Sequence, residues 1–263
     1  MSKNIRFFSI FIIGFSIYYF FDLFYFKDIQ SFSKGVFHSK AIAHVIAYTI
    51  TLLPLIITLK VLFPKKIILD LFSINKSVMK GFLPTFMATF PMVIGYYIHF
   101  AIIKTINVES LFINTISSAF FEEIIFRSFL FGTLYRFTRL GFLSSVLLGS
   151  LLFAQIHLYQ SQNTMELIEI FAITFLGSIL FAWVYMEMDF NLWAAIFLHF
   201  FMNLYWEIFN VSENVSGNLY GNIYKFVSII LLIGIVIYHK RKNKIPFQIT
   251  WKNLFIKTRE VQS

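Results

Sequence analysis

Long apolar runs recur along almost the whole sequence, and they constrain the fold more than any other feature. A run of roughly 20 apolar residues can cross the hydrocarbon layer of a membrane as a helix. Hydrophobic residues make up 58% of the 263 residues and charged residues only 13%, which lies outside the range of soluble proteins. The runs are also too uniformly apolar for the alternating strands of a membrane barrel. The sequence therefore predicts an all-α fold, a polytopic membrane helix bundle.

The runs predict about eight transmembrane helices. They are expected at residues 5–26, 41–63, 81–103, 111–137, 141–159, 167–186, 192–209 and 219–238. Asp22 lies near the end of the first run, so we expect its side chain at the membrane interface. The chain contains no cysteine, which excludes disulfides, thiolate metal sites and a cysteine nucleophile.

Lysine and arginine gather in alternate connections, and this asymmetry predicts the orientation. With the N-terminus inside, the cytoplasmic side carries Lys3, Arg6, Lys65, Lys66, Lys76, Lys80, Arg136, Arg139 and seven basic residues between Lys240 and Arg259, whereas the opposite side carries Lys27, Lys34, Lys40, Lys104 and Lys225. Basic residues favour the cytoplasmic side, so both termini are predicted to be cytoplasmic in a multi-pass protein, which we expect in a bacterial-type plasma membrane.

The formal charge of +9 is assigned to contacts with the lipid bilayer and not to nucleic acid. The basic tail after Tyr238 is expected to lie on anionic lipid or in solvent.

Three charged residues lie within the fourth run. A charged side chain at mid-membrane costs free energy, so the presence of three requires an explanation. The segment contains Glu122 and Glu123 followed by Arg127. At about 100° per residue, Arg127 lies on the same face as Glu123 but well away from Glu122. Glu123 is therefore the predicted ion-pair partner, and Glu122 is left without a local countercharge. A carboxylate in that situation is suited to act as a general base.

Two later runs each carry a histidine one helical turn from a second polar or aromatic side chain. The fifth run pairs Phe153 with His157, and the seventh pairs His199 with Asn203. On a helix, both members of each pair lie on one face. There are two alternatives to a catalytic site. The polar side chains could form a purely structural group of hydrogen bonds that joins helices, or the histidines could be hydrogen-bonded residues of the helix packing.

Several hydrolytic mechanisms find no support in the sequence. It contains no His-Glu-x-x-His, and no Gly-x-Ser-x-Gly or Ser-x-x-Lys motif falls within a predicted span. A glutamate and two histidines remain. Glu122 can take a proton from water, His157 can hold that water or protonate a leaving amine, and His199 with Asn203 can donate to a developing oxyanion.

The order of these motifs resembles a known family. Glu-Glu-x-x-x-Arg at 122–127, Phe-x-x-x-His at 153–157 and His-x-x-x-Asn at 199–203 are similar to the three motifs of the CAAX protease and bacteriocin-processing (CPBP, Abi) family, which includes the type II CAAX prenyl endopeptidases. The resemblance extends from Ser117 to Trp206. It implies a glutamate-dependent membrane endopeptidase that acts on a membrane-associated peptide or protein, in CAAX-type processing or in peptide maturation and immunity.

The resemblance also implies residue roles and a division of the chain. Glu122 would be the base and His157 the second catalytic group, with His199 and Asn203 as oxyanion donors. Glu123 and Arg127 would support Glu122, and Phe153 would form a wall of the cavity. Three N-terminal helices (1–110) would precede a catalytic core (111–210), followed by the last helix and a basic tail (211–263). No cofactor is favoured, although Glu122, His157 and His199 could also bind Zn²⁺ with a water as fourth ligand.

A non-enzymatic immunity or transport protein is the alternative class, because buried carboxylates and histidines also bind ligands or conduct protons. Transporters often show paired repeats with matching glycine or proline breaks. Here Pro54, Pro84 and Pro91 all lie in the first half, without a counterpart in a later run. The sequence thus favours the enzyme.

Overall fold

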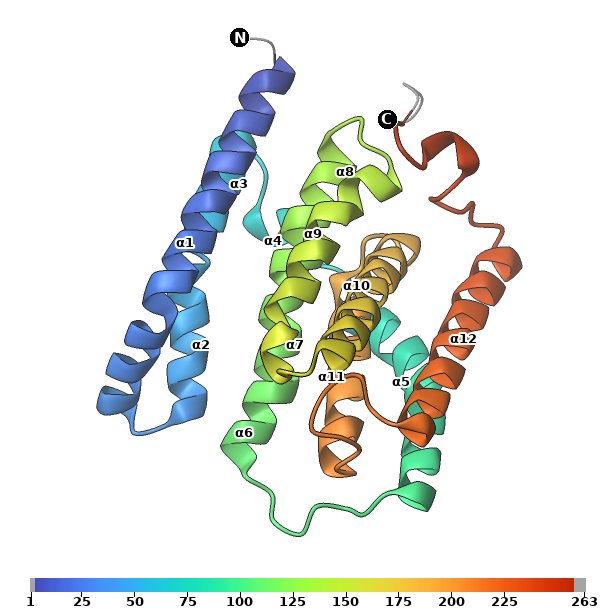
Figure 1. The fold of residues 1–263 in the computed structure, drawn as a ribbon. Coiled ribbons are helices and arrows are strands. Elements are labelled where there is room, and N and C mark those ends of the chain that lie inside the picture. Colours follow the sequence, from blue (N-terminus) through green and yellow to red (C-terminus); the bar gives the residue numbers. More distant parts are fainter. Residues whose placement is uncertain (1–2, 258–263) are drawn as a thin grey trace.

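The computed structural model describes residues 3–257, which form a bundle of helices (Figure 1). In chain order the elements are α1 (Lys3–Phe37), α2 (Lys40–Thr51), α3 (Leu53–Leu62), α4 (Ile68–Leu71), α5 (Val78–His99), α6 (Val108–Phe112), the π-helix η1 (Ile113–Ser117), α7 (Ser118–Glu122), the π-helix η2 (Glu123–Gly132), α8 (Thr133–Phe137), α9 (Phe142–Ile156), the 3₁₀ turn η3 (Leu158–Gln160), α10 (Thr164–Glu187), α11 (Leu192–Ile208), α12 (Leu219–Lys242) and the 3₁₀ turn η4 (Trp251–Asn253). Within the described residues, β-type backbone pairing is limited to one isolated antiparallel bridge between Leu140 and Ile256.

The predicted helical membrane bundle is confirmed. Within the described part of the chain, six helical segments are long and apolar enough to cross a membrane, namely 3–37, 40–62, 78–99, 142–160, 164–187 and 219–242. Helix α11 is apolar but shorter, and the helical segment 108–137 is divided by π-helical stretches. The expected number of eight spans is therefore not confirmed, although each expected run coincides with helical structure.

The first helix is longer than predicted. We expected it to end near Phe26, but α1 continues without a break to Phe37. It ends only at His38, which has a positive φ of 54°, and Ser39 then caps α2 by accepting a hydrogen bond from the backbone of Ile42. Since polar residues alone do not stop a helix, the polar stretch after Phe26 extends α1 beyond its apolar part. Asp22 consequently lies well inside α1 and not near its end.

Side-chain caps explain where most other helices begin. The capping residues are Ser77 before α5, Asn107 before α6, Asn163 before α10, Asn191 before α11 and Asn218 before α12, and each accepts from a backbone N–H of the first turn. Such caps satisfy amide groups that have no partner within the helix. The second membrane segment breaks at Leu52, between α2 and α3, where Pro54 begins a new helix.

Residues 108–137 follow one continuous helical path, in which α6, η1, α7, η2 and α8 succeed one another. The residues at each junction keep right-handed helical dihedral angles. The ten residues of η2 form π-helix, which is rare and often found at functional sites. The sequence did not predict this irregular winding.

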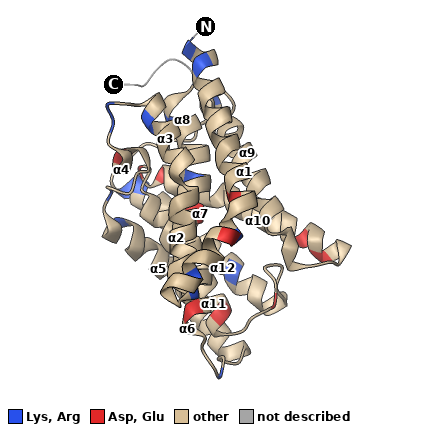
Figure 2. Ribbon diagram, turned by 90° about the vertical axis from the view of Figure 1, so that its left-hand side faces the viewer, with Lys and Arg blue, Asp and Glu red and all other residues tan. Residues whose placement is uncertain are grey.

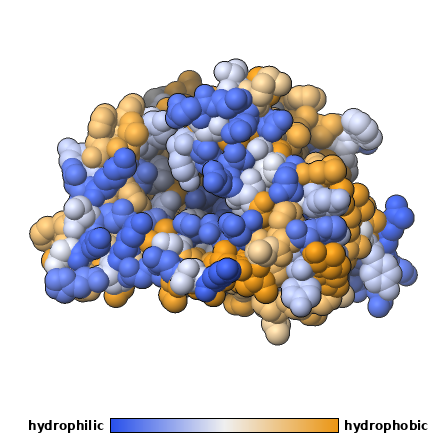
Figure 3. Space-filling model, turned by 60° about the horizontal axis from the view of Figure 1, so that its bottom comes forward, coloured by the Kyte–Doolittle hydropathy of each residue, from blue (hydrophilic) through white to orange (hydrophobic). Residues whose placement is uncertain are grey.

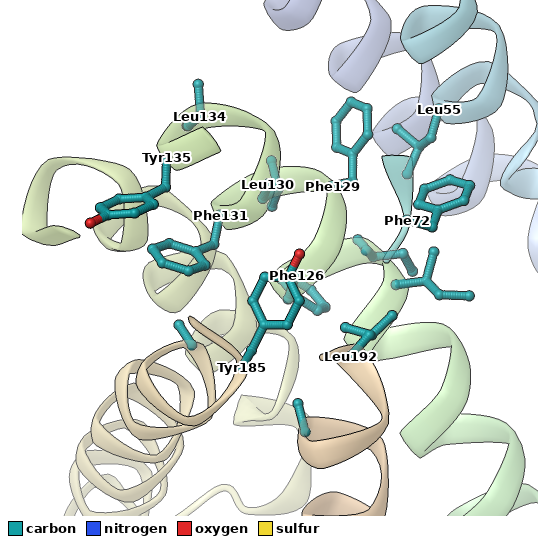
Figure 4. Close-up of a cluster of buried hydrophobic side chains, with 14 of the residues drawn as sticks. Leu55, Phe72, Phe126, Phe129, Leu130, Phe131, Leu134, Tyr135, Tyr185 and Leu192 are labelled. Atoms are coloured by element: carbon teal, nitrogen blue, oxygen red, sulfur yellow. The ribbon is translucent and has the colours of Figure 1, made fainter. Parts of the chain in front are cut away.

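The main core surrounds η2 and α8. Phe126, Phe129, Leu130 and Phe131 project from this helix toward side chains of α3, α10 and α11 (Figure 4). All ten residues of η2 are buried. The helix that carries both adjacent glutamates is thus held on all sides by other elements.

The remaining helices pack in groups around this core. Helix α1 lies along α2 and α3, α5 lies against α11 and α12, and α9 lies against α10 and η2. The beginning of α1 and the segment after α12 lie at the same end of the bundle (Figure 1). Charged residues gather toward the two ends, and a few lie within the middle of the bundle (Figure 2).

The segment after α12 does not extend away as a free tail. Its backbone pairs with the α8–α9 connection, where Gly141 N donates to Phe255 O and Leu143 N donates to Leu254 O. Glu187 at the end of α10 forms a buried ion pair with Lys240 and accepts from the backbone N–H groups of Gln248 and Ile249. We call residues 245–257 the C-terminal strap. Arg259, the last basic residue of the predicted tail, lies outside the described residues.

Candidate active site

Glu123 lies at the centre of a buried charge network. Its Oε2 atom is 3.0 Å from Nε of Arg127, and both side chains are almost fully enclosed, with exposures of 0% and 1%. Its other oxygen, Oε1, accepts a hydrogen bond from Nδ1 of His199 on α11 at 2.8 Å. The ion pair predicted between Glu123 and Arg127 is confirmed. The sequence did not show that the same carboxylate also holds an imidazole of another helix.

The guanidinium of Arg127 is stabilised mainly by aromatic rings and one carboxylate. Its contact with Glu123 is close but is not aligned as a hydrogen bond. The guanidinium carbon instead lies 4.3 Å from the ring centre of Phe153 and 5.0 Å from that of Phe181. A cation over aromatic faces is attracted by their negative potential. Phe153 thus acts as a packing partner of Arg127, and its role as a cavity wall stays a prediction.

His199 presents one free ring nitrogen toward Glu122. Because Glu123 accepts from Nδ1, a neutral His199 carries its proton there and leaves Nε2 unprotonated. Nε2 lies 4.0 Å from Oε2 of Glu122, too far for a direct hydrogen bond. Both glutamates therefore face the same imidazole, one at each ring nitrogen.

His157 is oriented in the same way by its own helix. It follows the last residue of α9, and its Nδ1 lies 2.7 Å from the carbonyl oxygen of Phe153. A carbonyl can only accept, so Nδ1 carries the proton and a neutral His157 also presents a free Nε2. The ring of Phe153 lies between the two imidazoles, 4.5 Å from that of His157 and 6.3 Å from that of His199.

Asn203 is engaged in a helix–helix contact. Its Nδ2 donates to the backbone oxygen of Asn114 in η1 at 2.8 Å, and Asn114 in turn donates to Glu207 at 3.0 Å. An amide nitrogen carries two hydrogens, so one N–H of Asn203 is used here and the second is available. This contact ties α11 to the helix that carries the glutamates.

Glu122 lies between the histidines and a cavity. Its Oε2 atom is buried and accepts no hydrogen bond from the described residues. A cavity of about 140 Å³ lies beside it, between α1, α2, α7, η2 and α9. The lining residues are Phe15, Tyr18, Tyr19, Asp22, Leu23, Tyr48, Glu122, Ile125, Phe126, Leu152 and Ile156. A cavity of this size is far larger than the roughly 10–15 Å³ that admits one water.

Asp22 is the site residue that the sequence analysis misplaced. We expected this side chain at the membrane interface, but it lies in the cavity wall opposite the helix of Glu122, with Oδ1 buried. The expectation was wrong because α1 is longer than its apolar run. The lack of a proline or a capping motif directly after Phe26 is the signal that could have placed Asp22 within the helix.

The described residues show no group of three His, Cys, Asp or Glu side chains arranged to hold a metal ion. The predicted zinc alternative needs Glu122, His157 and His199 to converge on one point. The arrangement of the described side chains does not fit such a centre, so we derive no step through a metal.

Comparison with known proteins identifies the segment that contains the site. Residues 104–205 match the family model described as type II CAAX prenyl endopeptidase Rce1-like, a family of proteases. No curated protein and no solved structure gives a significant match to the chain. The matched residues include all three motifs, from Glu122 through Asn203. The resemblance inferred from the motifs is therefore confirmed, and residues 104–205 are similar to the Rce1-like type II CAAX prenyl endopeptidase family.

Proposed function

We propose that the protein is an intramembrane endopeptidase that hydrolyses a peptide bond of a membrane-associated protein or peptide through a water activated by Glu122. One observation carries the proposal. Glu122 borders a cavity, and its buried Oε2, which accepts no hydrogen bond from the described residues, lies 4.0 Å from Nε2 of His199. A carboxylate placed in this way is available to water, as a general base must be.

Glu122, Glu123, His157, His199 and Asn203 each have a defined part in this reaction. Glu122 takes a proton from water, whose oxygen attacks the carbonyl carbon of the scissile bond. His199 in its protonated form donates from Nε2 to the oxyanion, and Glu123 stabilises that form through Nδ1. The free N–H of Asn203 is the second oxyanion donor. The proton taken from water passes to the leaving amine through His157 as the C–N bond breaks.

The surrounding chain supports this chemistry. Residues 111–210 form the catalytic core of the proposal, residues 1–110 cover it with three helical segments, and residues 211–263 supply α12 and the basic tail. We place both termini in the cytoplasm of a bacterial-type plasma membrane, on the basis of the basic residues in the connections. A hollow bordered by hydrophilic residues opens at the opposite end of the bundle (Figure 3) and offers a path for water and peptide.

The test is cleavage by the full chain in proteoliposomes. A library of fluorogenic peptides anchored to lipid, both prenylated and unmodified, is added to the wild type and to Glu122→Gln. We expect the variant to lose at least a hundredfold in kcat, as general-base removal does, while it remains inserted and folded. The matched control is Glu169→Gln, since Glu169 is an exposed glutamate of α10 outside the site. Full retention of cleavage by Glu122→Gln would refute the proposal.

A further inference from the structure

The cavity beside Glu122 contains a second carboxylate that the proposed reaction does not use. Asp22 projects from α1, and its Oδ1 is buried without a hydrogen bond from the described residues. Asp22 belongs to none of the ion pairs within the described residues. One carboxylate oxygen is therefore free and directed into a cavity.

A buried carboxylate without a countercharge is costly, and a positive ligand would remove that cost. The cation of the neighbouring network, Arg127, is already committed to Glu123 and to two rings. The cavity lining contains no lysine or arginine among the described residues. The described residues thus give Asp22 no ion-pair partner, and a bound molecule with a positive group would supply the missing charge.

The other walls of the cavity suit a long side chain with a cationic end. Four aromatic residues, Phe15, Tyr18, Tyr19 and Tyr48, line the same cavity as Asp22. Aromatic faces attract an ammonium group. The aliphatic side chains of Leu152 and Ile156 on α9 line the same cavity and can cover a methylene stem. One cavity thus combines an acid, aromatic rings and aliphatic side chains with the proposed general base.

We infer that the cavity receives the side chain of a lysine next to the scissile bond, and that Asp22 is the residue that determines this specificity. The inference rests on the proposed function, because Glu122 borders the cavity and the scissile bond must lie beside it. A lysine ammonium donates up to three hydrogen bonds, so Asp22 Oδ1 can accept one of them. Lysine fits better than arginine because its ammonium is compact and its stem narrow, whereas a guanidinium needs a flat, forked set of acceptors.

The experiment compares paired peptides that differ only in one residue beside the cleaved bond, which is lysine in one and norleucine in the other. The full-length protein in proteoliposomes should cleave the lysine peptide with the higher kcat/KM. Asp22→Asn should reduce the ratio of the two kcat/KM values roughly ten- to hundredfold, the range that corresponds to a lost charged hydrogen bond. Asp28→Asn is the matched control, because Asp28 is an exposed aspartate of the same helix. An unchanged ratio in Asp22→Asn would overturn the inference.

A binding measurement separates this inference from the proposed function. Equilibrium binding of both peptides is measured on Glu122→Gln, and again on the Asp22→Asn/Glu122→Gln double variant. We expect tighter binding of the lysine peptide to the first and loss of that preference in the second. Equal binding of both peptides to Glu122→Gln would reject the lysine site even if the wild type is a protease. Preserved lysine selectivity without any cleavage by the wild type would instead reject the endopeptidase and retain the site.

Discussion

His199 and Glu123 are joined by a hydrogen bond of 2.8 Å between Nδ1 and Oε1, while the second oxygen of Glu123 lies 3.0 Å from Arg127. One carboxylate of η2 thus serves two partners on different sides. It neutralises a buried guanidinium of its own helix and fixes the ring of a histidine on α11. The resemblance assigned Glu123 to the support of Glu122, and the geometry suggests that this support acts through His199.

Glu123→Gln should therefore reduce both stability and activity. The substitution leaves the guanidinium of Arg127 without a buried countercharge, and breaking such a pair costs about 3–5 kcal/mol. It also replaces the acceptor that orients His199. We expect a lower unfolding temperature in detergent and a fall in kcat of at least tenfold in the peptide assay. A variant with wild-type stability and rate would contradict the network.

Adding Arg127→Met to Glu123→Gln separates the two effects. Since the double variant has no stranded charge, most of the lost stability should return. The rate should stay low, because His199 still lacks its carboxylate. Unfolding temperature and kcat measured on all four proteins of the cycle test this expectation. A joint recovery of stability and rate would show that Glu123 acts only on the fold.

Chelation tests whether the reaction needs a metal. The described side chains of the site do not form a three-ligand group, so we propose that Glu122 activates water without a metal ion. Treatment with 1,10-phenanthroline, followed by dialysis, should leave cleavage by the wild type unchanged. The inactive analogue 1,7-phenanthroline is the control for nonspecific effects. Loss of activity that returns with added Zn²⁺ would support a zinc centre instead.

The C-terminal strap should depend on the carboxylate of Glu187. This side chain pairs with Lys240 and accepts the backbone N–H groups of Gln248 and Ile249. Glu187→Gln removes the charge from a buried pair, so residues 245–257 should loosen and exchange their amide hydrogens faster. Asp189→Asn is the control, because the Asp189–Lys76 pair is exposed and such pairs contribute little. Unchanged hydrogen exchange in Glu187→Gln would contradict this arrangement.

The contact between Glu109 and Ser39 predicts a dependence on pH. A hydrogen bond from Ser39 holds the pKa of Glu109, which lies before the fourth membrane run, below its usual value. A lowered pKa in the folded state means that the contact stabilises the fold above the pKa of the unfolded state and is lost as the pH falls through the folded pKa. Glu109→Gln should therefore lower the unfolding temperature at pH 7 and have a smaller effect in acid. An equal effect at both pH values would contradict the prediction.

The membrane bundle and the candidate site residues were readable from the sequence because each leaves a local signal. Apolar runs mark helices directly, and charged or imidazole side chains within them are rare enough to be noticed. The spacing of Glu123 and Arg127 was sufficient to predict their ion pair, since both lie on one helix and one turn apart. The helical class of the fold and the Glu123–Arg127 ion pair therefore needed no coordinates.

Other parts of the site depend on contacts between distant segments. No spacing rule links Glu123 to His199 or Asp22 to Glu122, because these pairs come from different helices. The π-helical winding of η2 is also invisible in the sequence, since it follows from packing around a fully buried helix. Similarly, nothing local distinguishes Lys240, which is buried against Glu187, from the other basic residues after Tyr238.

The C-terminal strap has a consequence for the biogenesis of the protein. It pairs with the α8–α9 connection, which the ribosome makes more than a hundred residues earlier. That connection must wait, with backbone groups unpaired, until α12 has been inserted and the strap has emerged. The two ends of α9, one at this connection and one next to His157, are then fixed at different times during synthesis, and the end at this connection becomes anchored only after the strap has been made.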